Sequence, residues 1–271
     1  KVDILKTVEK VLAGHGLGTV VLPPKISLNL GEDGTWPNYD GYLNAMPAYV
    51  GQYDIAGIKF AGGFWQNTNI GWPSIMAVII LNDPRNGAPL AIMDGEWITS
   101  LRTGASVAVG FKYLWPESRP ASLTIFGAGN QGKTSLLMCS QCLILHKVVV
   151  CDISPKALDN YQSWVQKQGP AIKDIPTSYV EDVKQAATGA DLLVTATPAK
   201  SPFLKREWLD SASVIAAIGS YQEVEDRVTL EADIRVVDNI SQALHRGNLQ
   251  PLVDAGKITH NDIYAEIGDI V

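Results

Sequence analysis

The feature that most constrains this chain is a set of three glycines placed between an apolar strand and a helix. The strand is predicted at Leu123–Phe126, and the segment Gly127-Ala-Gly-Asn-Gln-Gly132 follows it directly. The first glycine permits a tight turn, the second lets a ligand approach the backbone, and the third lets the helix pack closely on the strand. The first N–H groups of that helix and the positive end of its dipole face the loop, so a phosphate group is favoured there.

A carboxylate at the end of the next strand narrows the choice of ligand. Asp152 follows the apolar run Val148–Cys151, about 20 residues after Gly132. An acid at this place accepts hydrogen bonds from both ribose hydroxyls and repels a 2′-phosphate, so the pattern predicts NAD(H) in preference to NADP(H). A glycine-rich turn that binds no ligand is the structural alternative. Proteins that bind S-adenosylmethionine use similar loops, but the spacing and the later strands favour a dinucleotide. The predicted cofactor contacts here are Gly127, Ala128, Gly129, Asn130, Gln131 and Asp152.

From Ala121 onward, short apolar strands alternate with helices, which predicts a parallel sheet with right-handed crossovers. The segment Thr195-Ala196-Thr197 closes the fourth of these strands, and ligands of such sheets lie at the carboxyl ends of the strands. These three residues are therefore predicted to lie near the nicotinamide ribose, although a turn that only begins a helix is an equal alternative. The predicted strands are Leu123–Phe126, Val148–Cys151, Leu192–Ala196, Val214–Ile218 and Ile234–Val237, and the predicted helices are Lys133–Leu145, Pro155–Lys167 and Val180–Thr188.

The first third of the chain has a different, antiparallel character. Strands are predicted at Ile55–Phe60, Ser74–Leu81 and Pro89–Met93, helices at Ile4–Leu12 and Ile98–Leu114, and a loop or hairpin region at Gly31–Asn44. The expected fold class is α/β: a Rossmann-type parallel-sheet domain plus an α+β substrate and dimerisation domain built from both chain ends. The expected bounds are 1–115 for the α+β domain and 116–240 for the Rossmann domain, with 241–271 returning to the first domain.

Composition excludes several classes of function. The formal net charge is −6 and the pI is about 5.2, so the chain lacks a basic face for nucleic acid. Its apolar runs are too short to span a bilayer and no signal-like segment opens it, so no membrane association is expected. Three cysteines, Cys139, Cys142 and Cys151, fit a reducing cytoplasm better than a disulfide framework. None of the four histidines joins a metal-like cluster, so no metal is expected.

A resemblance adds to this interpretation. The chain resembles the ornithine cyclodeaminase/mu-crystallin family over nearly its whole length, most specifically in its Gly-x-Lys strand and in the Leu-Arg-Thr-Gly-Ala segment before the glycine loop. The resemblance implies hydride transfer between a nicotinamide and a carbon–nitrogen bond, and a homodimer. The matching segments are Gly57-Ile-Lys59, residues 67–73, Asp94-Gly95, Leu101-Arg-Thr-Gly-Ala105, the glycine loop, Ala190–Thr197, Ile218-Gly-Ser220 and Ala265-Glu-Ile-Gly268.

Lys59 is the predicted catalytic residue. It is a lone cation in the apolar stretch Ile55–Phe60, and a desolvated lysine can exchange protons near neutral pH. From the residues alone, a lysine at a strand edge with its head in solvent is the stronger interpretation. The resemblance reverses that order, because it implies that this lysine contacts the substrate and assists proton transfer.

Three further side chains are predicted to contact the substrate. Arg102 begins a helix, where the dipole disfavours a cation, and its guanidinium can grip a carboxylate through two hydrogen bonds. Lys25 stands where many relatives carry an arginine. A lysine keeps the positive charge but lacks the planar guanidinium that binds a carboxylate through two hydrogen bonds. Ser74 aligns with a small hydroxyl residue near the substrate. A solvated surface position is the alternative for both Arg102 and Lys25.

One departure from the family separates the possible reactions. Cyclodeaminases place an aspartate just after the glycine that corresponds to Gly219, whereas this chain has Ser220 and Tyr221. Glu223 and Asp226 lie nearby as possible substitutes. The missing acid favours a simpler imine reductase or amino-acid dehydrogenase acting on a small amino acid or imine. The alternatives are a cyclodeaminase that recycles NAD, a non-catalytic mu-crystallin-like binding protein, and an enzyme that makes opine-like or siderophore-precursor amino acids. Both chain ends are expected to be incomplete relative to the family.

Overall fold

The computed structural model describes residues 3–31 and 39–271, and the chain divides into two compact units. The parallel-sheet unit comprises Lys1–Glu9 and Leu101–Val271, and the antiparallel-sheet unit comprises Lys10–Ser100. Part of the loop predicted at Gly31–Asn44 lies outside the described residues. No helix in the described ranges is long and apolar enough to cross a bilayer.

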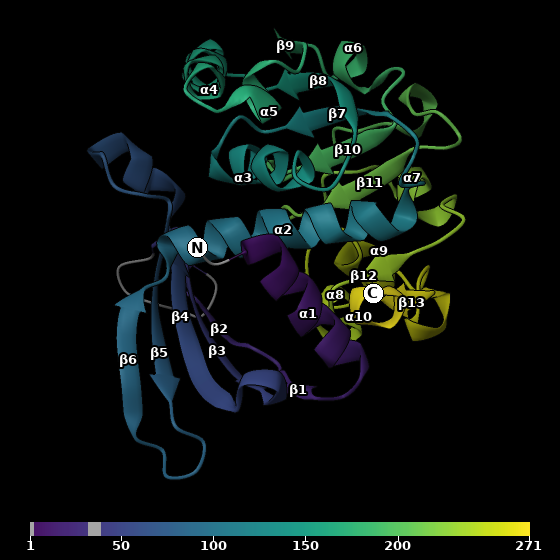
Figure 1. Ribbon diagram of the computed structural model, residues 1–271. Coiled ribbons are helices and arrows are strands. Elements are labelled where there is room, and N and C mark those ends of the chain that lie inside the picture. The colour runs from purple at the N-terminus through teal and green to yellow at the C-terminus, as the bar shows by residue number, and fades with distance from the viewer. Residues whose placement is uncertain (1–2, 32–38) are drawn as a thin grey trace. The chain divides into compact units, whose positions relative to one another are not determined.

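Five parallel strands form the main sheet of the first unit, in the order β11-β10-β7-β8-β9 (Figure 1). The chain starts at the central strand, adds two strands on one side, and then returns to add two on the other. The topological switch point therefore lies between β7 and β10, and the predicted α/β fold is confirmed. The strands are β7 (Ala121–Phe126), β8 (Leu145–Cys151), β9 (Thr177–Val180), β10 (Leu192–Thr195) and β11 (Val214–Ala217).

The crossover helices begin near their predicted starts and end earlier. The helix predicted to reach Leu145 ends at Cys139, because Leu143 turns back onto the Cys139 carbonyl and Leu145 opens β8. Val180, predicted to start a helix, instead ends the strand β9, which sequence reasoning missed. Its sequence Thr-Ser-Tyr-Val is short and largely polar, so hydrophobic periodicity does not mark it as a strand. The helices are α3 (Asn130–Cys139), α4 (Pro155–Gln166), α5 (Pro170–Lys173), α6 (Val183–Ala187) and α7 (Asp226–Leu230).

The last part of the chain groups with the parallel-sheet unit. The strand predicted at Ile234–Val237 is shortened to β12 (Val236–Val237), which pairs with β13 (Ala265–Glu266) and stays outside the main sheet. Leu252, Ile258 and Ile263 form a small core of their own there. The observed grouping and the boundary at Ser100 differ from the expected domain bounds. The remaining helices are α8 (Ile240–Ala243), α9 (Gln250–Asp254) and α10 (Ile267–Ile270).

The second unit is built on an antiparallel sheet with the strand order β1-β3-β4-β5-β6, in which β2 also pairs with β3. The predicted strands are present, but β2 and β3 were missed, because β2 has only four residues and β3 begins in the predicted loop and carries Pro47. The strands are β1 (Val20–Val21), β2 (Ile26–Asn29), β3 (Tyr42–Val50), β4 (Ile55–Gly63), β5 (Ile75–Asn82) and β6 (Pro89–Asp94). Helices α1 (Ile4–Gly16) and α2 (Glu96–Leu114) each begin in one unit and end in the other, and short 3-10 turns lie at Gly51–Tyr53, Trp65–Ile70, Arg206–Trp208 and His260–Asp262.

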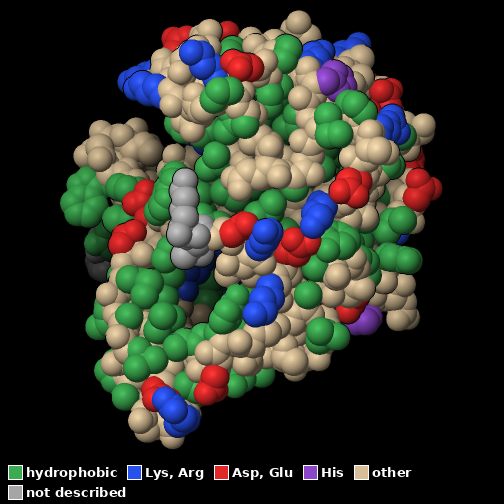
Figure 2. Space-filling view, in the orientation of Figure 1, with side chains coloured by type: hydrophobic (Ala, Val, Ile, Leu, Met, Phe, Trp, Pro, Cys, Tyr) green, Lys and Arg blue, Asp and Glu red, His purple; other side chains and the backbone are tan. Residues whose placement is uncertain are grey.

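The two faces of this sheet differ in exposure. Ala61 and Ala77 pair across β4 and β5 and are buried on one face. The opposite face carries large apolar side chains that remain exposed, and Figure 2 shows hydrophobic side chains over the antiparallel strands. We call this set the apolar sheet face: Ile26, Leu28, Phe60, Val78 and Ile92.

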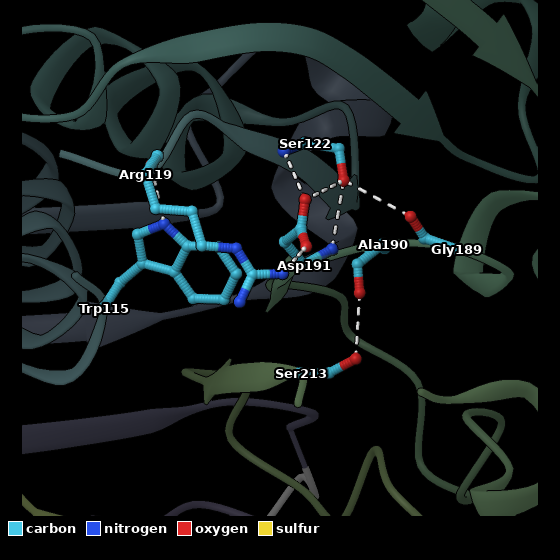
Figure 3. Close-up of polar contacts among 7 residues, drawn as sticks. All are labelled: Trp115, Arg119, Ser122, Gly189, Ala190, Asp191 and Ser213. Atoms are coloured by element: carbon cyan, nitrogen blue, oxygen red, sulfur yellow. Dashed lines mark hydrogen bonds and ion pairs between the residues drawn. The ribbon is translucent and has the colours of Figure 1, made fainter. Parts of the chain in front are cut away.

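A polar network ties the amino ends of the parallel strands together (Figure 3). One Asp191 carboxylate oxygen accepts hydrogen bonds from the Ser122 backbone N–H at 2.9 Å and from its hydroxyl at 2.8 Å, while the Asp191 N–H donates to that hydroxyl. Arg119 reaches the other oxygen and stacks over Trp115, 4.3 Å from the ring centroid. These contacts join the start of β7 to the start of β10.

We expect Asp191→Ala to destabilise the protein by about 1–3 kcal/mol, because it leaves the buried Ser122 N–H without its acceptor. Urea denaturation followed by tryptophan fluorescence measures the change. Asp159→Ala removes an exposed carboxylate from α4 and should change the free energy of unfolding by less than about 0.5 kcal/mol. Equal stability of the two variants would contradict the role of the network.

Candidate active site

The glycine loop is fixed at the switch point of the parallel sheet. Gly127 has a φ of 103°, a conformation that favours glycine, and its N–H donates to the Cys151 carbonyl at 2.8 Å. The Ala196 N–H donates to the Phe126 carbonyl at 2.9 Å, so the end of β10 lies directly beside the turn. A Cβ on Gly127 would collide with the Ala196 carbonyl. The first glycine is thus required by the backbone of the residue that follows β10.

The other two glycines differ in what surrounds them. A Cβ on Gly132 would collide with the Gly127 carbonyl, so the start of α3 can lie this close to the turn only with glycine there. A Cβ on Gly129 would meet no described atom within 4 Å. Nearby, the Gln131 side-chain oxygen is buried and has no hydrogen-bond partner among the described residues. The space over Gly129 therefore suits a phosphate group next to the start of α3.

Asp152 lies at the carboxyl end of β8 and is partly exposed. One carboxylate oxygen accepts from the Ala128 N–H at 2.8 Å and the other from the Ser154 N–H at 2.9 Å. These bonds hold the acid against the glycine loop. Each oxygen keeps acceptor capacity for a ribose hydroxyl, as the sequence predicts. Asp152 and the loop are therefore brought together.

Helix α2 carries the Leu-Arg-Thr-Gly-Ala segment and packs closely on α3. A Cβ on Gly104 would collide with the Thr134 carbonyl, so this glycine permits the close approach of the two helices. Arg102, two residues earlier, is exposed at its surface. The protein around it still removes enough water to lower the pKa of its guanidinium, and the negative charge of Asp238 opposes that shift. Arg102 is therefore a partly desolvated cation that water still reaches.

Lys59 lies in the middle of β4, between Met46 on β3 and Ile79 on β5. Its alternation places it on the same face as the buried Ala61, and its ammonium donates to the Thr99 hydroxyl at 3.4 Å. Asn44 lies on this face too, is 4% exposed, and has a buried side-chain oxygen without a hydrogen-bond partner among the described residues. Sequence reasoning missed Asn44 and Thr99, because neither position carries a pattern that marks it as buried.

The remaining two predicted substrate contacts also belong to the antiparallel-sheet unit. Lys25 precedes β2, and continuing the pairing of Ile26 with Ala45 by one residue sets Lys25 opposite Met46, the neighbour of Lys59. Register thus brings the two lysines to neighbouring positions across β3, about 10 Å apart at the backbone. Ser74 lies just before β5, where its carbonyl accepts from the Phe64 N–H.

Both acids named as possible substitutes, Glu223 and Asp226, already have hydrogen-bond partners. Glu223 is fully buried, and its carboxylate accepts hydrogen bonds from Thr195, Thr197 and Gly219. Asp226 is bound by Lys257 at 2.6 Å and by Gln222, and these contacts lower its pKa. The sequence could flag the acids, but only the fold shows that both are already engaged.

Comparison with known proteins gives the family. The model of the ornithine cyclodeaminase/mu-crystallin family matches residues 1–271. The chain belongs to this family. An alanine dehydrogenase of Archaeoglobus fulgidus is 32% identical over 99% of this chain and 79% of its own length.

Two solved structures of family members show the same fold. A Δ1-pyrroline-2-carboxylate reductase of Thermococcus litoralis, in complex with NADH and L-proline, has a TM-score of 0.89 and 28% identity, covering 99% of this chain and 81% of that one. An archaeal alanine dehydrogenase dimer with bound NAD has a TM-score of 0.85 and 32% identity, covering 98% and 79%. Family members of this similarity are thus oxidoreductases that act on amino acids or imines with NAD(H).

The CxxC pair of this family member consists of protected thiols. Burial raises the pKa of Cys139 well above its usual value and that of Cys142 to about 11, so neither thiol is a reactive thiolate at neutral pH. Among the described residues, no group of three or more His, Cys, Asp or Glu side chains is placed to hold a metal ion.

We expect the two loop glycines to respond differently to alanine. Gly127→Ala should cost about 1–3 kcal/mol of stability, because the backbone is left-handed and Ala196 blocks the side chain. Gly129→Ala should change stability by less than about 0.5 kcal/mol, because its Cβ meets open space. Urea denaturation of both variants provides the measurement. Equal losses would show that the space over Gly129 is filled.

Proposed function

We propose that this protein is an NAD(H)-dependent oxidoreductase that transfers hydride to or from the carbon–nitrogen bond of a small amino acid or its imine. The observation that carries the proposal is the glycine loop at the switch point, open over Gly129 and flanked by Asp152. Gly127, Ala128, Asn130 and Gln131 complete the phosphate side, and Ala196 and Thr197 face the nicotinamide ribose. Thr195, the third residue predicted there, is fully buried and supports them from behind. Asp152 favours NAD(H) over NADP(H), because a 2′-phosphate would meet its charge.

Substrate binding is assigned to side chains that can hold a carboxylate. Arg102 grips it through its guanidinium fork, and Lys25 and Ser74 add a charge and a hydroxyl. Reduction of an imine adds a hydride to the carbon and a proton to the nitrogen. Lys59 supplies that proton, or removes it in the oxidative direction, because its ammonium lies on the buried face of β4 beside Thr99.

The geometry after Gly219 argues against cyclodeaminase chemistry. Such a reaction needs an acid free to act on the departing amine. Glu223 is saturated by hydrogen bonds and Asp226 is paired with Lys257. We therefore favour a reaction that consumes or produces NADH over one that recycles it.

The test is the change in absorbance of NADH and NADPH with cyclic imines, 2-oxo acids plus amines, and L-ornithine with NAD. Consumption of NADH, faster than NADPH, with an imine is the expected result. Ammonia release and proline formation from ornithine without net NADH change would make this protein a cyclodeaminase. Tight NADH binding without turnover would favour a non-catalytic binding protein, and activity only with substrates bearing two carboxylates would favour an opine-like dehydrogenase.

Lys59→Met should lower turnover about 100-fold or more and leave NADH affinity within about twofold, because it removes the proton donor and keeps the apolar stem. Steady-state rates and NADH fluorescence titration measure the two effects. Lys147→Met, at the exposed start of β8, is the matched control and should retain full turnover. Unchanged turnover of the Lys59 variant would remove Lys59 from the mechanism.

We also propose that two copies of the chain associate through the apolar sheet face. Exposed fractions of 48% for Phe60, 44% for Val78 and 71% for Ile92 are unfavourable for a surface that stays in water. A second copy is the favoured occupant because the archaeal relative is a dimer.

Val78→Glu should weaken the dimer at least about tenfold, since it places a charge in the middle of this face. Light scattering coupled to size-exclusion chromatography at several concentrations measures the mass. Ile144→Glu, which alters an exposed apolar residue just before β8, should leave the mass unchanged. A wild-type protein that elutes as a monomer at micromolar concentration would refute the dimer.

A further inference from the structure

Glu223 is a buried acid with a complete set of hydrogen-bond donors. Its side chain is 0% exposed. Oxygen Oε1 accepts from the Thr197 N–H at 2.7 Å and the Thr197 hydroxyl at 2.6 Å, and Oε2 accepts from the Thr195 hydroxyl at 2.8 Å and the Gly219 N–H at 2.9 Å. Four donors fill the acceptor sites of an ionised carboxylate, which is acceptor-only.

The network has no cationic partner, so hydrogen bonds alone stabilise the charge. No ion pair joins Glu223 to a lysine or arginine among residues 3–31 and 39–271. Burial raises the pKa of Glu223, and its four hydrogen bonds oppose that shift. Burying this acid costs free energy of folding that a hydrophobic residue at the same place would not cost. We therefore infer that the carboxylate serves to hold the surrounding backbone in one specific conformation.

The backbone that carries Glu223 is itself held in place. Its N–H donates to the Asn248 side-chain oxygen at 2.7 Å, and its carbonyl accepts from the N–H groups of Phe203 and Leu204. The carboxylate is thus presented from a fixed point toward the ends of β10 and β11. A Cβ on Gly219 would collide with it, so this residue, the second after β11, must remain glycine.

The residues that Glu223 holds are the ones beside the glycine loop. Thr195 ends β10, and the next residue, Ala196, donates to Phe126 and lies against Gly127. Hydrogen bonds to Thr195 and Thr197 on both sides of Ala196 therefore fix the backbone on one side of the switch point. We propose that Glu223 is the positioning residue of the cofactor site, which sets the carboxyl ends of β10 and β11 against the nicotinamide half of the dinucleotide. The inference rests on the proposed dinucleotide function.

Glu223→Gln is the sharpest test, because it keeps the shape and fails in either orientation of the amide. An NH2 group at Oε1 would face the Thr197 N–H, and one at Oε2 would face the Gly219 N–H. A hydroxyl can rotate to accept, but a backbone N–H cannot. The segment after β10 must therefore shift.

The experiment compares two probes on the full chain: NADH, which spans the site, and ADP, which reaches only the glycine loop and Asp152. Calorimetric titration of Glu223→Gln should show NADH affinity lowered about tenfold or more, with ADP affinity within about twofold of wild type. Asp191→Asn, an isosteric change in the network at the opposite end of the same sheet, is the matched control and should leave both affinities unchanged.

Each other outcome overturns the inference in a recognisable way. Equal NADH affinity of the Glu223→Gln variant and the wild type refutes the positioning role. If the variant loses affinity for NADH and ADP to the same extent, Glu223 only supports the fold in general and the positioning role is also refuted. A wild-type protein that binds neither probe refutes the dinucleotide function itself. If Glu223→Gln does not fold, Thr195→Val removes one donor to Oε2 at constant volume, and the same criteria apply to it, with Thr195→Ser expected to restore wild-type NADH affinity.

Discussion

The close approach of β10 to the turn after β7 is the constraint on which the candidate site depends. The Ala196 N–H bonds to Phe126, and the Ala196 carbonyl leaves no room for a side chain on Gly127. This contact explains why the turn after β7 needs glycine, and it lies at the place where the strand order reverses. Ligand-binding crevices of parallel sheets form where the order reverses, because neighbouring connections there leave in opposite directions.

The two ends of the parallel sheet are built from similar chemistry for different purposes. At the amino ends, Asp191 joins β7 to β10 through Ser122. At the carboxyl ends, Glu223 joins β10 to β11 through Thr195 and Gly219. Asp191 is partly exposed and has Arg119 as a partner, whereas Glu223 is fully enclosed and has donors only. Burying Glu223 without a cation costs more free energy than the partly exposed Asp191–Arg119 pair, and Glu223 lies at the same end of the sheet as the glycine loop.

Local patterns predicted the parts of the fold that depend on neighbouring residues in the chain. The glycine loop, Asp152 at the end of β8 and the family resemblance were all visible in the sequence, and the α/β fold and the family are confirmed. The roles of Lys59, Arg102, Lys25 and Ser74 stay predictions. Two of the missed strands, β2 and β9, have four residues each, and a run this short does not separate strand from loop or helix.

The sequence by itself determined which backbone turns are possible, since glycine and proline act through their own φ angles, and which charges lie near the loop. Only the tertiary structure decided which acids are available for chemistry. Glu223 and Asp226 look equivalent in the sequence, yet one is enclosed by donors from Thr195, Thr197 and Gly219 and the other is paired with Lys257. Those partners lie up to 31 residues away in the chain. The physical reason is that burial and hydrogen bonding, which fix the state of an acid, come from contacts that no local pattern encodes.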